Sequence, residues 1–265
     1  MIYTCYEMIR DCRAGSAAGW TYLLRHYAPV IGVLLAHYFP ERRQDTAFLE
    51  RMLLELRKPD SSLFRTLDPV PERAFVAELR QHVLGLAESE AGVAPRVSID
   101  LQALSAALEP LTVTEKLTVW LEAMRYSNEE TGRMLRMSAE TAEKIRDRAA
   151  ELVRSAVDRW SRSLLPDNGP ALRRASAGVK TSECLQAKAF FDVIDGRTTW
   201  YGREEMERHV KSCWYCLDHY CRLLEVVDVL RASKPLADSE LERYRHLLGI
   251  ELEKRPFWKR LAGAG

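Results

Sequence analysis

The sequence predicts an all-α protein made of three small helical domains. Apolar residues recur at intervals of three and four along almost the whole chain, which is the period of one face of a helix. Strand patterns are scarce, and two stretches with helix-breaking residues, 91–97 and 164–170, interrupt the helical pattern. A chain of 265 residues is long enough for two or three domains that each bury a core.

The composition narrows the classes of function. The formal net charge is only +1, so any DNA binding must come from local basic patches. The N-terminus lacks the pattern of a signal peptide, and the most apolar stretch, 28–36, is far shorter than the roughly 20 residues that span a bilayer. We therefore expect a cytoplasmic protein without a membrane partner. Its six cysteines would stay reduced there, so clustered cysteines indicate metal ligands or redox sensors.

The expected domain order follows from apolar stripes and breakers. Three stripes predict the helices of a first domain. They are Leu23, Leu24, Tyr27, Val30, Ile31, Leu34, Leu35 and Tyr38; Phe48, Met52, Leu53 and Leu56; and Phe75, Val76, Leu79, Val83 and Leu86. The predicted order is a helical domain at 1–90, a linker at 91–104, a second helical domain at 105–162, a flexible linker at 163–182, a third domain at 183–232, and a last helix with a basic aromatic tail at 233–265.

The third domain carries a metal-ligand pattern, His-x3-Cys-x2-Cys, at residues 209–216. His209 and Cys213 share one face of a helix because they are four residues apart. A continuous helix would separate His209 and Cys216 by roughly 10 Å of rise, whereas tetrahedral zinc ligands lie only about 3.5 Å apart. We therefore expect the helix to end near Ser212–Cys213 and a new helix to begin around Cys216.

Closing a structural site needs a fourth ligand, and Cys184 is the best candidate. The predicted site therefore binds Zn2+ through Cys184, His209, Cys213 and Cys216. Cys221 or His219 could take the place of Cys184. The alternative without a metal is that these are buried free cysteines and a surface histidine.

A site closed by four protein ligands leaves no open position for a substrate water, which favours structure over catalysis. The sequence also lacks a glycine-rich phosphate loop and a Gly-x-Ser-x-Gly motif. We therefore expect a protein that is not an enzyme. The aromatic pair Trp200–Tyr201 is expected to pack at a helix entry, and a surface for a partner is the alternative.

The pattern of N-cap residues in the second domain predicts a helix-turn-helix. Ser127 and Ser138 are suitable N-caps, with Glu130 and Thr141 three residues after them. The segment 141–153 would then stand in the recognition position. Segment 109–162 nevertheless contains ten basic and ten acidic residues, so a helical hairpin that only packs against its neighbours remains an alternative.

Residues 183–232 resemble the zinc-binding anti-sigma family. Cys184, the Asp195–Gly196 turn, His209, Cys213 and Cys216 carry the resemblance. In that family the helices wrap a sigma factor and block its polymerase-binding surfaces, and some members use the zinc cysteines as a thiol switch.

Residues 109–153 resemble region 4 of the extracytoplasmic-function sigma factors, and segments 15–29 and 73–79 resemble helices of region 2. The resemblance implies an initiation factor that binds RNA polymerase core and promoter DNA and contacts its own zinc domain. It assigns polymerase binding to Asp45 and Glu50. It assigns DNA binding to Thr141, Lys144, Arg146 and Arg148.

The sequence also departs from the sigma pattern. Residues 87–90 read Ala-Glu-Ser-Glu where that family usually carries a basic stretch, and carboxylates surround the basic residues of 141–153. A sigma-like protein that has lost promoter reading and acts as an adaptor is therefore the second hypothesis. A zinc-dependent enzyme is the third.

Overall fold

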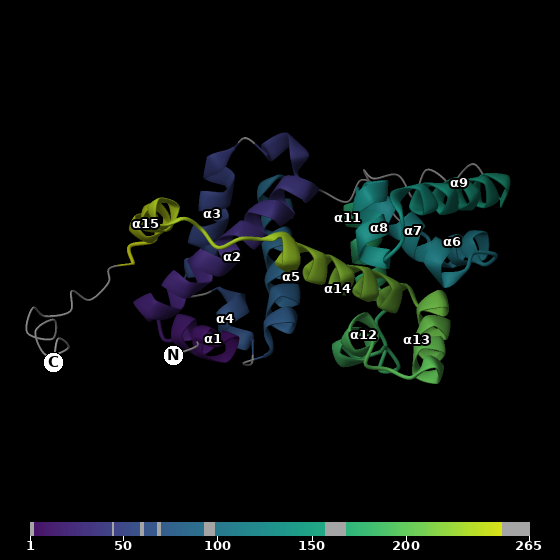
Figure 1. Ribbon diagram of the computed structural model, residues 1–265. Helices are drawn as coiled ribbons and strands as arrows, with labels where there is room; N and C mark the ends of the chain where they lie inside the picture. The colour runs from purple at the N-terminus through teal and green to yellow at the C-terminus, as the bar shows by residue number, and fades with distance from the viewer. Residues whose placement is uncertain are drawn as a thin grey trace, which may run out of the picture. The chain divides into compact units, whose positions relative to one another are not determined.

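The computed structural model describes residues 3–43, 45–58, 61–67, 70–92, 99–156 and 168–250. Every regular element in these ranges is a helix, which confirms the all-α prediction (Figure 1). The chain divides into two compact units, one made of 1–87 with 233–265 and the other of 88–232. Among the described helices, none combines the length and apolar character needed to cross a bilayer.

The first unit begins with helices whose buried faces match the predicted stripes. Its elements are α1 (Cys5–Arg13), α2 (Ala17–Tyr38), the short 3-10 helix η1 (Pro40–Arg42), α3 (Thr46–Arg57), α4 (Ser62–Thr66) and α5 (Glu72–Glu90). All the stripe residues are buried except Tyr38 and Leu86, which are half-buried. The three stripes therefore form the core of this unit.

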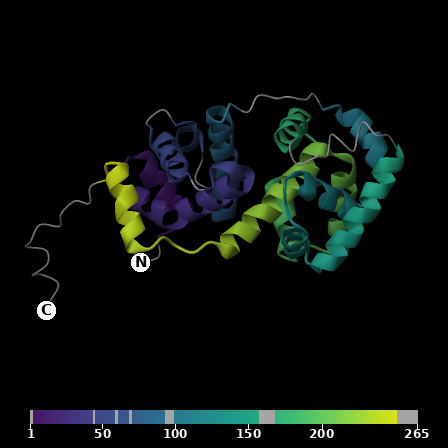
Figure 2. The ribbon, with the colours of Figure 1, turned by 90° about the horizontal axis from the view of Figure 1, so that it is seen from above.

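The C-terminal helix α15 (Asp238–Leu247) completes the first unit by packing on α2 and α3 (Figure 2). The amide of Leu236 donates to the carbonyl of Arg25 over 2.8 Å, and the Arg25 guanidinium pairs with Asp238 at 2.6 Å. Leu241 and Tyr244 of α15 are buried. The two ends of the chain thus share one fold. The basic aromatic tail predicted beyond α15 lies outside the described residues.

The second unit is built around one long helix, α14. Its elements are α6 (Leu101–Leu108), α7 (Val113–Ala123), α8 (Asn128–Leu135), α9 (Ala139–Ala156), α11 (Gly169–Gly178), α12 (Ala187–Ile194), α13 (Trp200–Ser212) and α14 (Trp214–Ala232). Helices α7, α8, α11, α12 and α13 all pack against α14. The helix-turn-helix segment and the cysteine-bearing segment therefore share one compact unit.

Both segments that we expected to be linkers contain helical residues. Helix α6 begins at Leu101, inside 91–104, and α11 occupies much of 163–182. Pro170 stands in the first turn of α11, where its missing N–H costs no hydrogen bond. Leu172 is fully buried and α11 packs against α14. Tertiary burial therefore makes a helix from a segment whose local residues indicate a break.

We expect Gly19→Ala to destabilise the first unit. A Cβ at this position in α2 would lie 2.7 Å from the backbone nitrogen of Cys12 in α1, which is too close for any real contact. The loss in free energy of unfolding should be about 1–3 kcal/mol, measured by chemical denaturation.

Gly85→Ala in α5 is the matched control, because nothing lies within 4 Å of its added Cβ. Alanine is the better helix former, so this variant should gain about 0.5–1 kcal/mol. Equal effects at the two positions would contradict the close α1–α2 packing.

Candidate metal centre beside a helix-turn-helix

Three cysteines from separate segments converge on one point of the second unit. Cys184 lies before α12, Cys213 lies between α13 and α14, and Cys216 lies in the first turn of α14. Their sulfur atoms all lie within 4.8 Å of one another, and those of Cys184 and Cys213 are 3.8 Å apart. Sulfur ligands of a tetrahedral zinc ion, with bonds of about 2.3 Å, would be separated by roughly 3.8 Å. The cluster could therefore hold a metal ion.

The break between α13 and α14 creates this convergence. Helix α13 ends at Ser212, Cys213 has extended backbone angles (φ −116°, ψ 110°), and α14 starts at Trp214. This confirms the predicted helix end. Because the chain turns here, His209 Nε2 comes within 3.2 Å of Cys216 Sγ. The imidazole on the last turn of α13 thus lies beside Cys216, but it is outside the group of three side chains whose ligand atoms all lie within 4.8 Å of one another.

Backbone donors point at two of the sulfur atoms. The amide of Thr181 donates to Cys184 Sγ and the amide of Leu185 donates to Cys216 Sγ, both over 3.3 Å. Burial raises the pKa of the Cys184 thiol, but the hydrogen bonds from Thr181 and the neighbouring thiols outweigh it and lower the pKa below its usual range. These donors favour the thiolate form of Cys184, which is the form that binds metal.

Cys216 shows why a cation suits the cluster. Burial, reinforced by the neighbouring Cys213, raises the pKa of the Cys216 thiol to about 12. Three adjacent thiols cannot all ionise without a positive charge between them. Sulfur donors with an imidazole beside them suit a transition-metal ion, which supplies that charge.

Neither alternative ligand joins the cluster of described residues. Cys221 is buried on α14, away from the three converging sulfurs. The His219 ring packs against Phe190 and Tyr215, and burial lowers its pKa to about 4. The structure therefore brings Cys184, rather than Cys221, to the Cys213–Cys216 pair.

The helix-turn-helix segment forms as its caps predict. Ser127 Oγ accepts from the amide of Glu130 over 3.2 Å, and the Glu130 carboxylate accepts from the amide of Ser127 over 2.8 Å. Ser138 Oγ accepts from the amide of Thr141 over 3.1 Å at the start of α9. Gly132 allows the tight turn, since a Cβ there would lie 2.8 Å from the carbonyl oxygen of Met137.

The candidate DNA-binding residues all lie on α9, and Thr141 is exposed in its first turn. The three basic side chains each have a carboxylate partner. The pairs are Lys144 with Glu140 at 2.6 Å, Arg146 with Asp147 at 3.0 Å, and Arg148 with Glu115 at 3.2 Å. Lys144 and Arg148 still expose 73% and 72% of their side chains, so both remain accessible to a ligand.

The cysteine-bearing helices pack on the first two helices of the helix-turn-helix region. Trp120 of α7 donates from Nε1 to the buried carboxylate of Asp218 on α14 over 3.1 Å, and Arg222 pairs with the same carboxylate at 2.9 Å. Trp214 donates to Ser105 Oγ over 2.6 Å. The ammonium group of Lys116 donates over 2.9 Å to a carbonyl in the last turn of α13. Polar contacts therefore join the two segments, and the one between Trp120 and Asp218 is buried.

The candidate polymerase-binding residues lie in the first unit and have internal partners. Asp45 caps α3 by accepting from the amide of Phe48 over 3.2 Å, and it pairs with Arg51 at 3.1 Å. Glu50 lies 3.8 Å from the guanidinium of Arg243 on α15. The C-terminal helix thus approaches one of the two candidate residues.

Sequence reasoning missed two features of this region. Asp218 was not identified as a residue that joins the two segments, although an acidic residue within an apolar stretch of α14 was a usable signal. The prediction that Trp200–Tyr201 packs at a helix entry was wrong, since these side chains are 77% and 65% exposed. Thr199 already caps α13 by accepting from the amide of Gly202 over 3.1 Å, so the entry needs no aromatic packing.

Comparison of the chain with protein-family models, curated proteins and solved structures gave no match. The sigma and anti-sigma resemblances therefore rest on the residues that carry them.

We expect Asp218→Ala to destabilise the second unit strongly. The substitution leaves the Trp120 N–H and the Arg222 guanidinium without their buried carboxylate, which should cost about 3–5 kcal/mol in free energy of unfolding. Asp228→Ala is the control, because Asp228 also joins α14 to the helix-turn-helix through Arg133, at 3.0 Å, but in an exposed ion pair. Its cost should stay below about 1 kcal/mol. Equal losses in denaturation experiments would contradict the assigned role of Asp218.

Proposed function

We propose that the chain is a regulator of transcription initiation that resembles extracytoplasmic-function sigma factors, and that a zinc-binding module in the same chain regulates it. One observation carries the proposal: a capped helix-turn-helix and a three-cysteine cluster share a single compact unit. A helix-turn-helix is a binding element, and the cysteine-bearing helices pack on α7 and α8, next to its recognition helix.

The proposed metal is Zn2+, held by Cys184, His209, Cys213 and Cys216. The sulfur separations support three of these ligands. His209, whose Nε2 lies 3.2 Å from Cys216 Sγ, is the proposed fourth. Bound zinc would neutralise the thiolates and fasten the segment before α12 to the junction of α13 and α14. That fastening would fix the surface that α14 presents to α7 and α8.

We further propose that the C-terminal part of the chain masks polymerase-binding surfaces. Helices α13 and α14 pack on α7, and α14 also packs on α8, while α15 approaches Glu50 in the first unit. The exposed side chains of Lys144 and Arg148 on α9 support a mask that leaves the base-reading face accessible.

One observation favours the alternative, an adaptor that has lost promoter reading. Each basic candidate on α9 already has a carboxylate partner, as Lys144 has in Glu140. A phosphate group must compete with these carboxylates for the cation, which weakens DNA binding.

For the metal, we expect the purified full-length protein to contain about one zinc per chain, and Cys184→Ser to lose it. Serine offers no thiolate, so the site would lack one of its ligands. Metal content by atomic emission, together with helicity by circular dichroism, gives the readout.

Cys221→Ser is the matched control, because Cys221 lies outside the cluster. It should keep its zinc. If Cys221→Ser loses zinc and Cys184→Ser keeps it, Cys221 is the ligand and Cys184 is not. If the unsubstituted protein contains no zinc, the proposed zinc site is wrong.

For transcription, we expect the full-length protein to direct core RNA polymerase to initiate at specific sites in run-off assays. Lys144→Glu and Arg148→Glu should each reduce the transcript by about tenfold, because each replaces a phosphate-attracting or base-contacting cation with an anion.

Lys188→Glu is the control, because Lys188 is an exposed lysine on α12 that also has an i,i+4 carboxylate partner. Its transcript should be unchanged. Polymerase binding should be measured in parallel by sedimentation. Binding without initiation would reject promoter reading and support the adaptor, and absence of both would reject the sigma-like assignment.

A further inference from the structure

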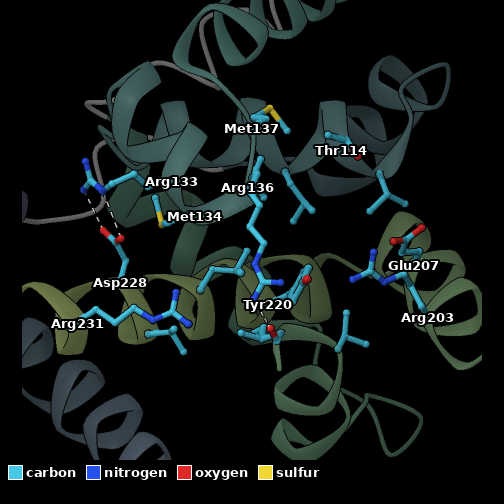
Figure 3. Close-up of a pocket in the computed structure, with 17 residues that line it drawn as sticks. Thr114, Arg133, Met134, Arg136, Met137, Arg203, Glu207, Tyr220, Asp228 and Arg231 are labelled. Carbon is cyan, nitrogen blue, oxygen red and sulfur yellow. Dashed lines mark hydrogen bonds and ion pairs between the residues drawn. The ribbon is translucent and has the colours of Figure 1, made fainter. Parts of the chain in front are cut away.

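The second unit contains a cavity of about 370 Å³ between the helix-turn-helix and the cysteine-bearing helices (Figure 3). Its walls come from α7, α8 and the turn after it on one side, and from α12, α13 and α14 on the other. This volume falls within the range of small-molecule sites, roughly 300–1,000 Å³. The proposed sigma-like function gives this cavity no role.

Part of the cavity wall is apolar. Met134 on α8, Val193 on α12, and Leu224 and Val227 on α14 are buried residues that line it. A ligand that covers this wall gains free energy in proportion to the apolar area removed from water. The ligand should therefore have an apolar body.

The polar part of the wall is positively charged. Four arginines line the cavity, namely Arg133, Arg136, Arg203 and Arg231, against only two carboxylates, those of Glu207 and Asp228. Asp228 pairs with Arg133 at 3.0 Å. Arg136 donates to the carbonyl oxygen of Ile194 over 2.6 Å, and this neutral partner leaves the charge of Arg136 uncompensated. The cavity therefore favours an anion.

Tyr220 marks where the anionic group would bind. Tyr220 lines the cavity together with Arg136 and Arg203. Burial, reinforced by the charge of Glu207, raises the pKa of the Tyr220 phenol to about 12, although the charges of the two arginines act in the opposite direction. The hydroxyl therefore stays protonated at neutral pH. It has no hydrogen-bond partner among the described residues, so it is available to donate to a ligand. Figure 3 shows Arg136 extending from the helix-turn-helix side of the cavity toward Tyr220.

The backbone at Arg136 adds an independent observation. Arg136 caps α8 with a left-handed conformation (φ 60°, ψ 46°), which glycine normally supplies. Arginine accepts a conformational cost at this position, and such strain clusters at ligand clamps and switch regions. This turn places the Arg136 side chain at the cavity wall.

We propose that this cavity binds a small amphipathic anion, with a carboxylate or phosphate head between Arg136, Arg203 and Tyr220 and an apolar body against α12 and α14. The site goes beyond the proposed function, because its contacts are the same whether or not the chain reads a promoter. A bound ligand would touch both the helix-turn-helix and the cysteine-bearing helices and would strengthen their association.

Calorimetric titration of the metal-loaded full-length protein tests this site with three matched probes: decanoate, decyl phosphate and 1-decanol. We expect one saturable site per chain for at least one of the two anions, with a dissociation constant in the micromolar range. The tighter of the two identifies the head group. 1-Decanol should bind at least about tenfold more weakly, because it lacks the charge.

Two substitutions localise the binding. Arg203→Gln removes one of the two guanidinium groups proposed to hold the head group, and it should weaken binding of the tighter anion by about tenfold. Arg208→Gln, on the same helix but outside the cavity, should leave the affinity unchanged. Tyr220→Phe keeps the ring and removes only the donor, so it should weaken binding by a few-fold.

Three results would overturn the proposal. They are the absence of saturable binding by either anion up to roughly millimolar concentration, equal affinity for 1-decanol, and an affinity unaffected by Arg203→Gln. Circular dichroism of each variant checks that its helicity is retained, so that a loss of binding reports on the site itself.

Discussion

The backbone at Cys213 interrupts what would otherwise be one helix from Trp200 to Ala232. Because this single residue is extended, the last turn of α13 faces the first turn of α14, and His209 reaches Cys216. The same change of direction lets α14 pack along α7 and α8 while α13 packs on α7. The convergence of the cysteines and the contact with the helix-turn-helix both depend on this break.

Helix α14, which begins directly after that break, contributes residues to three features of the second unit. Its first turn holds Cys216, its second turn holds the buried Asp218 and the cavity residue Tyr220, and a later turn holds Asp228. Residues of the cysteine cluster, the segment interface and the cavity are thus spaced along one helix.

Local rules predicted much of this structure. Apolar periodicity gave the buried stripes of α2, α3 and α5, and side-chain caps gave the turn between α8 and α9. The short separation expected between zinc ligands predicted the helix end at Ser212, because a continuous helix would hold His209 and Cys216 too far apart. Features that depend on distant residues did not follow from the sequence: α11 is stabilised by α14, and α15 joins the first unit. The cavity combines residues about a hundred positions apart, such as Arg136 and Arg231, so no local sequence pattern predicts it.

The docking of α15 on α2 and α3 has a consequence for the order of events during synthesis. The first unit needs residues from both ends of the chain, and the ribosome must make the whole second unit before α15 emerges. At about 5–20 residues per second, this interval lasts roughly seven to thirty seconds. During that time Glu50 lacks its C-terminal neighbour Arg243. Each newly made chain therefore passes through a brief period in which this surface is open to other molecules before the chain covers it.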